Sequence, residues 1–207
     1  MTKMTVTNTK KLLELYTQGQ RNFSGLDLEQ ATLSEVNLSG IELWQANLAG
    51  SYLSLSLLRS TNLSDANLNQ ATLWRTDLTE ASLVDTQLCS AILIRANFQQ
   101  GDLTKANLKG ADLRLANLQS TDLYRADLTR ANLSYANLQG ANLREANLYG
   151  ADLTGANLTG ADLSRANLTR AIVHRADLTQ VVGEEATLTQ VQRVRVPKRS
   201  LADYKTA

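Results

Sequence analysis

Few residues of this chain have the types and spacing that catalysis or metal binding requires. His174 is the only histidine and Cys89 is the only cysteine. One histidine could serve a single Ser-His-Asp or Cys-His arrangement, but the two residues together exclude a disulfide framework and a Cys/His zinc site. We therefore expect both to be surface or packing residues, and we predict no metal and no cofactor.

Carboxylates are more plentiful, but they recur at the spacing of a sequence repeat, as at Asp102, Asp122 and Asp162. Asp and Asn side chains accept hydrogen bonds from nearby backbone amides in turns. We expect these carboxylates to hydrogen-bond turns and to balance arginines, and not to act as a paired general acid and base. The glycines of residues 150–155 also follow the repeat, so they form no phosphate-binding loop. The sequence predicts a protein without catalytic activity.

Charge is distributed unevenly along the chain, whose formal net charge is +1. Residues 1–20 sum to +2 and residues 191–207 to +4, which leaves −5 for the segment between them. No run approaches ~18 consecutive apolar residues, and the N-terminus lacks the apolar core of a secretory signal. We expect a soluble, cytoplasmic protein whose basic C-terminal residues are a solvated tail and not a nucleic-acid site; they are Arg193, Arg195, Lys198 and Arg199.

A repeat of five residues runs through most of the chain and must position its side chains. Every fifth residue from Phe23 to Leu178 is Leu, Phe or Val. The residue two positions earlier is usually Ala, and the residue directly before is usually Asn or Asp. The consensus is A-(N/D)-L-x-x.

A period of five fits neither of the common secondary structures. On an α-helix, residues five apart are rotated by about 140° after one full turn, so the leucines would form no stripe. On a continuous strand they would alternate between the two faces. All leucines point the same way only if the chain turns once per pentapeptide, with Leu and Ala inside. Most of the glycines lie two residues after the Leu column, where a corner favours residues that tolerate unusual dihedral angles.

This motif is similar to that of the pentapeptide-repeat family over residues 21–180. The resemblance implies an all-β solenoid, a right-handed quadrilateral parallel β-helix in which the Leu and the small residue stack inside. The number of sides comes from the resemblance, because the period alone does not fix it. With four pentapeptides per coil, the chain forms about eight coils and a rod of about 38 Å at ~4.8 Å per coil.

Residues 1–20 carry the signals of a helix that closes the N-terminal end of the rod. Asn8 or Thr9 can cap such a helix and Gly19 can end it. The apolar residues at helical spacing are Leu12, Leu13, Leu15 and Tyr16. The column two residues before each leucine supports this interpretation. Its members are usually small, and the larger ones all lie in the first coil or at the start of the second; they are Arg21, Leu26, Val36 and Ile41.

The C-terminal end of the repeat is less regular. The column of inward leucines is interrupted at Gly183, and we expect it to resume once at Leu188. Residues 194–197 could form a final edge strand blunted by Arg and Pro. The predicted organisation is a capping helix at 1–20, the repeat domain at 21–190 and a basic C-terminal cap or tail at 191–207.

One outer side of the predicted rod carries more large apolar residues and arginines than the other three. Aromatic, aliphatic and Arg side chains together are typical of a protein-binding patch. Drift of a repeat surface would produce a similar pattern, and a second copy of the chain could be the partner, as in a homodimer. The candidate binding residues are Tyr52, Leu55, Trp74, Arg75, Ile92, Ile94, Arg95, Arg114, Leu115 and Tyr135.

We therefore expect a scaffold or regulatory module that binds a protein partner, which the sequence does not identify; nucleic acid and membranes are not expected as partners. The family also includes proteins that protect DNA gyrase by mimicking DNA, so a gyrase modulator is the alternative. Mimicry needs a strongly acidic rod, and arginines interrupt the later coils here. The segment from Leu12 to Phe23 resembles the N-terminal part of cyanobacterial members of the family, including a regulator of heterocyst differentiation that contacts a transcription factor.

Overall fold

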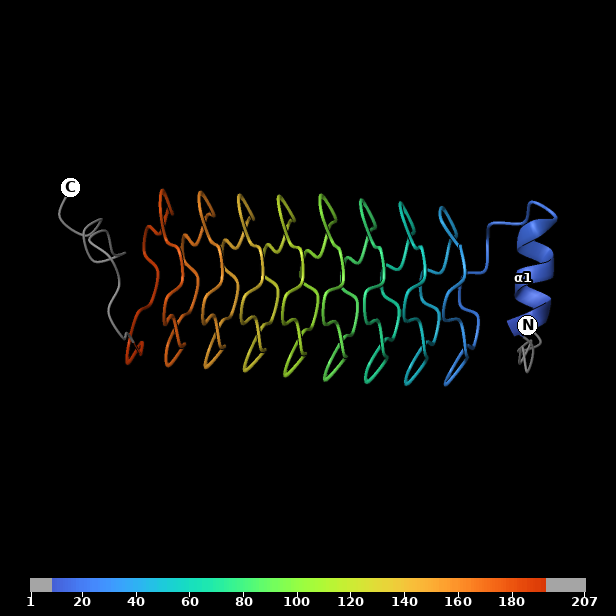
Figure 1. Cartoon of the computed structure of the whole chain (residues 1–207), viewed down its shortest axis with the longest axis horizontal. Helices are drawn as coiled ribbons and strands as arrows, with labels where there is room; N and C mark the ends of the chain where they lie inside the picture. Colours follow the sequence, from blue (N-terminus) through green and yellow to red (C-terminus); the bar gives the residue numbers. More distant parts are fainter. Residues whose placement is uncertain (1–8, 193–207) are drawn as a thin grey trace.

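A computed structural model describes residues 9–192 as one helix followed by a long regular stack of coils (Figure 1). Helix α1 spans Thr9–Thr17 and lies across one end of the stack. Beyond it, the described chain has no extended strands, and each pentapeptide contributes a single bridge residue. The predicted cap residue Asn8, the predicted strand at 194–197 and the basic tail beyond Gln192 lie outside the described residues.

Parallel bridges join each of these residues to the residue twenty positions later, from the pair Asn22 and Glu42 to the pair Ile172 and Gln192. Four pentapeptides therefore make one coil, and each forms one side. The leucine column is interrupted at Gly183, but the backbone stack is not, because the bridges of Val182 and Thr187 continue it on either side. Backbone groups make these bridges, so a missing leucine does not interrupt them.

The backbone amides of a pentapeptide are all hydrogen-bonded, which explains the consensus. In residues 131–135 the five N–H groups have acceptors at 2.7–3.0 Å. The acceptors, in chain order, are Leu128 O, Ala111 O, Asp152 O, the side-chain Oδ1 of Asn132 and Thr154 O. Only the amide two residues after Asn132 relies on a side chain. The preference for Asn or Asp before each leucine follows from this need, because unpaired polar backbone groups are costly.

The last residue of each pentapeptide forms a left-handed corner. Glycines occupy some of these corners, such as Gly160 with φ +68°. The same conformation occurs at non-glycine corners such as Gln100 (φ +58°) and Arg130 (φ +56°). An L-residue in this region costs about 1–2 kcal/mol relative to the right-handed region. The corner amide offsets part of this cost by donating to a carbonyl of the next coil, as Gln100 does to Gln119 at 3.1 Å.

The leucine and alanine columns form the core, and nearly all of their members are fully buried. Helix α1 adds Leu12 to this core with 1% of its surface exposed. The helix ends in a Schellman motif, in which Gly19 N donates to Tyr16 O at 3.0 Å and Gln20 N donates to Leu15 O at 3.0 Å. The Tyr16 hydroxyl donates to Ser39 O at 2.7 Å and so ties α1 to the first coil.

The large residues at the start of the inward column divide into two groups. Ile41 is buried, while Leu26 and Val36 are half-buried and pack against the core. The inward assignment of Arg21 is wrong, because its side chain is exposed and its guanidinium lies 4.1 Å from the centre of the Tyr16 ring. A guanidinium cannot be buried cheaply without a charged partner. Among the described residues, no helix combines the length and the apolar character that crossing a membrane requires.

Candidate protein-binding face

The four sides of the rod can be named after their first buried residue: Phe23 for side 1, Leu28 for side 2, Leu33 for side 3 and Leu38 for side 4. Each side then recurs every twenty residues. Sides 1 and 3 are opposite each other, as are sides 2 and 4, because four pentapeptides close one coil. All ten predicted binding residues fall on side 3.

Side 3 carries most of the exposed large apolar residues of the described chain. Between 36% and 60% of each of these residues is exposed, and Ile94 beside them is half-buried. Elsewhere in residues 9–192, only Trp44 and Val182 on side 1 and Leu57 on side 4 are comparable. The exposed apolar residues of side 3 are Tyr52, Leu55, Trp74, Ile92, Leu115 and Tyr135.

Three of these residues occupy left-handed corners, with φ of +62° at Leu55, +60° at Leu115 and +59° at Tyr135. Every other corner in the described coils holds glycine or a polar or charged residue. Side 3 therefore places apolar side chains where both the backbone conformation and contact with water are unfavourable. The ring of Tyr135 lies against Gly155 in the next coil, where an added Cβ would be 2.6 Å from ring carbons Cδ1 and Cε1.

The arginines of side 3 have different surroundings. Arg114 forms a two-point hydrogen bond with Asp112, with Nε to Oδ1 at 2.8 Å and Nη2 to Oδ2 at 2.6 Å. The Arg75 guanidinium lies 5.2 Å from the centre of the Trp74 ring. Within residues 9–192, neither Arg75 nor Arg95 forms an ion pair.

The backbone holds this cluster in register across coils. Leu55 N donates to Trp74 O at 2.9 Å, Arg75 N donates to Ile94 O at 3.0 Å, and Arg95 N donates to Arg114 O at 3.0 Å. Neighbouring coils therefore present these side chains in adjacent rows. The structure brings the predicted residues together as one continuous face.

Side 1 differs because the last four residues of its corner column alternate in charge, whereas the Asp65, Asp85 and Lys105 corners before them do not. Arg125 pairs with Glu145 at 2.7 Å, and Arg165 pairs with Glu185 at 2.8 Å. The hydrogen bond from Arg125 lowers the pKa of Glu145 below its ordinary value. These four charges are therefore matched within the chain.

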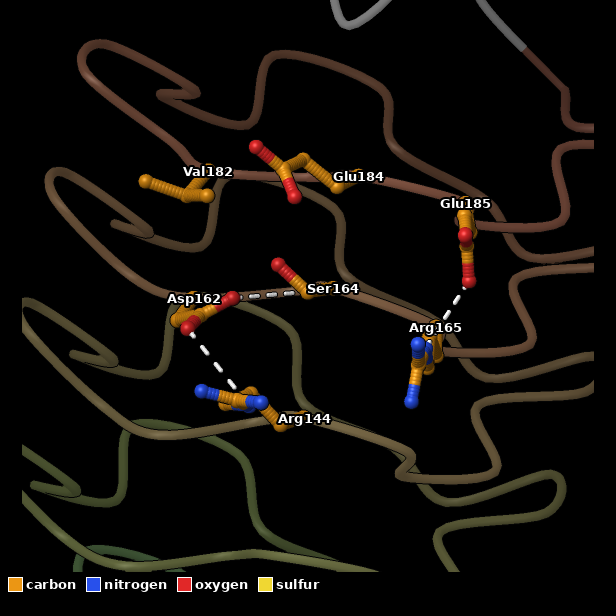
Figure 2. Close-up of a pocket in the computed structure, with 7 residues that line it drawn as sticks. All are labelled: Arg144, Asp162, Ser164, Arg165, Val182, Glu184 and Glu185. Carbon is orange, nitrogen blue, oxygen red and sulfur yellow. Dashed lines mark hydrogen bonds and ion pairs between the residues drawn. The ribbon is translucent and has the colours of Figure 1, made fainter.

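Side 1 also has an open groove of about 240 Å³ near the C-terminal end (Figure 2). Two of the dashed contacts join lining side chains, since Arg144 Nε lies 4.0 Å from Asp162 and Arg165 lies 2.8 Å from Glu185, and the third is the bond from the Ser164 backbone amide to Asp162 at 2.9 Å. Among the described residues the groove has no nucleophile hydrogen-bonded to a base, and four of its five charged side chains are paired within the chain. Its lining residues are Arg144, Asp162, Ser164, Arg165, Val182, Glu184 and Glu185.

The residues considered first for chemistry have structural surroundings. His174 on side 3 and Cys89 on side 2 are both half-buried. The turn role expected for Asp102, Asp122 and Asp162 is confirmed, because each carboxylate accepts the amide two residues later at 2.9 Å. Within the part of the chain that the structure describes, no three His, Cys, Asp or Glu side chains gather where they could hold a metal ion.

Comparisons with known proteins agree with the repeat. A sequence model of pentapeptide repeats matches in eight copies, at residues 37–75, 75–110, 111–149 and 146–182. A search of curated proteins finds no match. No catalytic family is indicated.

Three solved structures illustrate the similarity. HetL, a pentapeptide repeat protein involved in heterocyst differentiation regulation from the cyanobacterium Nostoc sp. strain PCC 7120, is 34% identical over 86% of this chain and 93% of its own, with a TM-score of 0.44. The pentapeptide repeat protein alr5209 from Nostoc PCC 7120 is 38% identical over 50% of this chain and 79% of its own, with a TM-score of 0.32. QnrB1, a plasmid-mediated fluoroquinolone resistance protein, is 15% identical over 84% of this chain and 92% of its own, with a TM-score of 0.66.

Proposed function

The chain belongs to the pentapeptide-repeat family, whose fold is a right-handed quadrilateral β-helix, and on this premise we propose that it is a non-catalytic module that binds a protein through side 3. In this proposal the rod has about eight coils, α1 caps its N-terminal end, and side 3 is displayed as a rigid surface. A regulatory role accords with the similarity to HetL, a protein involved in heterocyst differentiation regulation.

The observation that carries the proposal is the placement of the apolar corner residues. Leu55, Leu115 and Tyr135 are the apolar residues at left-handed corners of the described coils, and all three lie on side 3. Random drift of an outer surface would distribute such residues over all four sides. Their confinement to one side favours a surface that is covered by a partner, because exposed apolar patches commonly mark interaction sites.

The rod is also well suited to binding, because its backbone is already ordered. From residues 51–55 onward, each pentapeptide of side 3 is joined to both neighbouring coils by hydrogen bonds, such as Leu73 N to Ile92 O at 2.7 Å and Thr72 N to Ser51 O at 2.8 Å. Little backbone entropy is then lost on association, which improves affinity for a given buried area. Aromatic and arginine side chains on such a support are the residue types most often found at binding hot spots.

The alternative is a gyrase modulator that mimics or engages DNA. A DNA mimic needs continuous negative charge along the rod. Here arginine and lysine side chains lie among the carboxylates, as in the pairs Arg59 with Asp77 at 2.6 Å and Lys109 with Asp127 at 3.1 Å. This mixed charge supports binding of an ordinary protein surface, and the similarity to QnrB1 extends to the fold alone.

The test replaces three side chains of side 3 at once, as Trp74→Ser, Ile94→Ser and Arg95→Ser. We expect the variant to fold and to lose at least about tenfold in capture of its protein partner from the native host, or in self-association if the partner is a second copy. Affinity capture with mass spectrometry and sedimentation measure these two outcomes, after the melting temperature has been checked.

A matched variant on the opposite side controls for surface truncation in general. Trp44→Ser, Val84→Ser and Arg125→Ser remove the same kinds of side chain from side 1. We expect this variant to capture partners as the wild type does. Equal capture by the wild type and the side 3 variant, with an unchanged oligomeric state, would reject side 3 as the interface.

A further inference from the structure

The corner column of side 3 forms a ridge along the rod. Its residues Leu55, Arg75, Arg95, Leu115 and Tyr135 are twenty apart in sequence, so they lie on five consecutive coils. Adjacent coils are about 4.8 Å apart. The ridge therefore presents two cations between apolar groups over about 19 Å.

The two arginines of the ridge occupy corners one coil apart, and neither forms an ion pair within residues 9–192. On side 1, Glu145 lies one coil beyond Arg125 and Glu185 one coil beyond Arg165, and each pair is bonded. On side 3, the residue one coil beyond Arg75 is Arg95. Like charges one coil apart repel each other. On side 1 the Arg125 next to Lys105 is paired with Glu145, whereas neither Arg75 nor Arg95 has an ion-pair partner within residues 9–192, so a negatively charged group on a partner would relieve the repulsion here.

Arg75 is also oriented for an external acceptor. Its guanidinium lies over the Trp74 ring at 5.2 Å from the centroid. Stacking covers an apolar face of the guanidinium and leaves the N–H donors at its edge available. A carboxylate is the group that matches such donors with two hydrogen bonds.

Resting on the proposed function, we propose that side 3 binds an acidic amphipathic α-helix of a partner protein, which lies along the rod. Two carboxylates of that helix, spaced i and i+3 or i+4, face Arg75 and Arg95. Apolar residues one turn before and one or two turns after them contact Leu55, Leu115 and Tyr135. About 13 helical residues span the ridge at ~1.5 Å per residue.

Spacing decides between a helix and an extended segment. One helical turn rises about 5.4 Å, which exceeds the spacing between adjacent coils by about 0.6 Å. The mismatch between helix turns and coils therefore accumulates to about 2.4 Å over the four intervals of the ridge. Side chains on one face of a strand recur every ~6.7 Å, which exceeds the coil spacing by about 2 Å. For a strand the mismatch accumulates to about 8 Å over the same four intervals. Because the backbone amides of side 3 already have acceptors within the rod, as at Leu73 and Arg75, a strand also finds no free sheet edge to extend.

The experiment selects binders without assuming their sequence. A display library of 20-residue helical peptides, randomised on one face, is panned against the full chain. We expect enriched peptides to carry two Asp or Glu residues at i and i+3 or i+4 between apolar residues, and to be helical by circular dichroism when bound. Enrichment of non-acidic peptides, enriched peptides that lose their helical circular dichroism on binding, or no enrichment overturns the proposal.

Charge reversal then tests the assigned arginines by fluorescence anisotropy with one enriched peptide. The double substitution Arg75→Glu and Arg95→Glu should weaken its affinity at least tenfold, and a peptide with Lys in place of its two acidic residues should regain binding to that variant. The control, Lys105→Glu with Arg130→Glu, has the same change in net charge on sides 1 and 2 and should change affinity less than twofold. Equal loss in both double variants, or displacement of the peptide by a DNA duplex, overturns the proposal.

The two proposals fail in different ways. If enriched peptides lose affinity for the Trp74, Ile94 and Arg95 variant but lack acidic pairs, side 3 remains a protein-binding face and only the acidic helix is wrong. If the same variant captures its cellular partner as well as the wild type does, the proposed function fails.

Discussion

The buried columns and the outer columns of the rod follow different rules. Inside, the same small and aliphatic residues recur along the described coils, and residues such as Leu113 and Ala111 are fully buried. Outside, the sides diverge, although the backbone beneath them is the same. The fold depends on the inward residues and the backbone hydrogen bonds, so the outer residues are free to specialise.

Sides 3 and 4 show how far the outer columns diverge. On side 4, Asn97, Asn117, Asn137 and Asn157 form a ladder in which each amide donates to the preceding Oδ1 at 2.8–3.2 Å. The equivalent column on side 3 begins with Thr32, Tyr52, Thr72 and Ile92, which cannot continue such a ladder. The first coils of side 3 therefore lack hydrogen bonds that stabilise side 4, and this accords with the proposed binding role of side 3, because binding surfaces often compete with stability.

The largest effect should come from placing a charge in the buried leucine column, which tests the difference between buried and outer columns most directly. Leu113→Asp should abolish folding, with a loss above about 4 kcal/mol, because it buries an unpaired carboxylate. Circular dichroism and thermal unfolding measure the effect.

The control for that variant lies in an outer column. Asn107→Ser removes the hydrogen bond from Asn107 Nδ2 to Gln87 Oε1 at 2.9 Å, and should cost about 1 kcal/mol. A Leu113→Asp protein that melts like the wild type would show that the leucine column is not the core.

The second prediction concerns the end of the buried column. Deletion of residues 1–20 removes Leu12 from the core and uncovers the first coil, which α1 contacts. Exposed apolar surface and unpaired backbone groups favour association, so the truncated chain should dimerise or aggregate more than the full chain. Light scattering compares the size distributions of the truncated chain and the full chain. Equal monodispersity of both would show that α1 does not cap the rod.

The third prediction isolates the backbone cost of a corner. At Gly160 (φ +68°) an added Cβ would meet nothing within 4 Å, so Gly160→Ala tests conformation without a clash. We expect a loss of about 1 kcal/mol in the free energy of unfolding by urea. Gln180→Ala, in the same column with φ +57°, should change it little. Equal effects in both variants would contradict the left-handed assignment.

The smallest expected effect is a loss of folding stability at low pH that comes from carboxylates in the outer columns. Burial raises the pKa of Asp127, but hydrogen bonds from Thr129 and the charge of Lys109 outweigh it, so the pKa of Asp127 lies below its ordinary value. Thr179 lies two residues after Asp177, as Thr129 does after Asp127, and its hydrogen bonds likewise lower the pKa of Asp177. Carboxylates with a lowered native pKa contribute stability above the unfolded pKa of about 3.9, and lose it as the pH falls through the native pKa.

Replacing these two carboxylates should therefore reduce the sensitivity to acid. Asp127→Asn with Asp177→Asn keeps an oxygen acceptor for the turn, as Asn does at Asn137 for the amide of Gln139 at 3.3 Å. The urea midpoint of this variant should fall less between about pH 6 and about pH 3 than that of the wild type. An equally steep fall would show that these two groups do not contribute.

The core and the corners were largely predictable, because their rules are local. The spacing of leucines from Phe23 to Leu178 indicates which residues point inward, and glycines such as Gly160 mark the corners. The sequence did not indicate that Gln100 and Arg130 adopt the same left-handed conformation, since neither residue type favours it. Arg21 was assigned inward because it continues the spacing, whereas its charge keeps it outside against Tyr16.

The sequence by itself determined the five-residue period, the inward Leu and Ala columns, the excess of apolar residues and arginines on one predicted side, and the scarcity of catalytic residues. Each of these depends on residue type and on neighbours within a few positions. Only the tertiary structure decided which charges meet, because a corner residue contacts the residue twenty positions away. It is this stacking that pairs Arg125 with Glu145, places Arg75 beside Arg95, and aligns three left-handed apolar corners on one side of the rod.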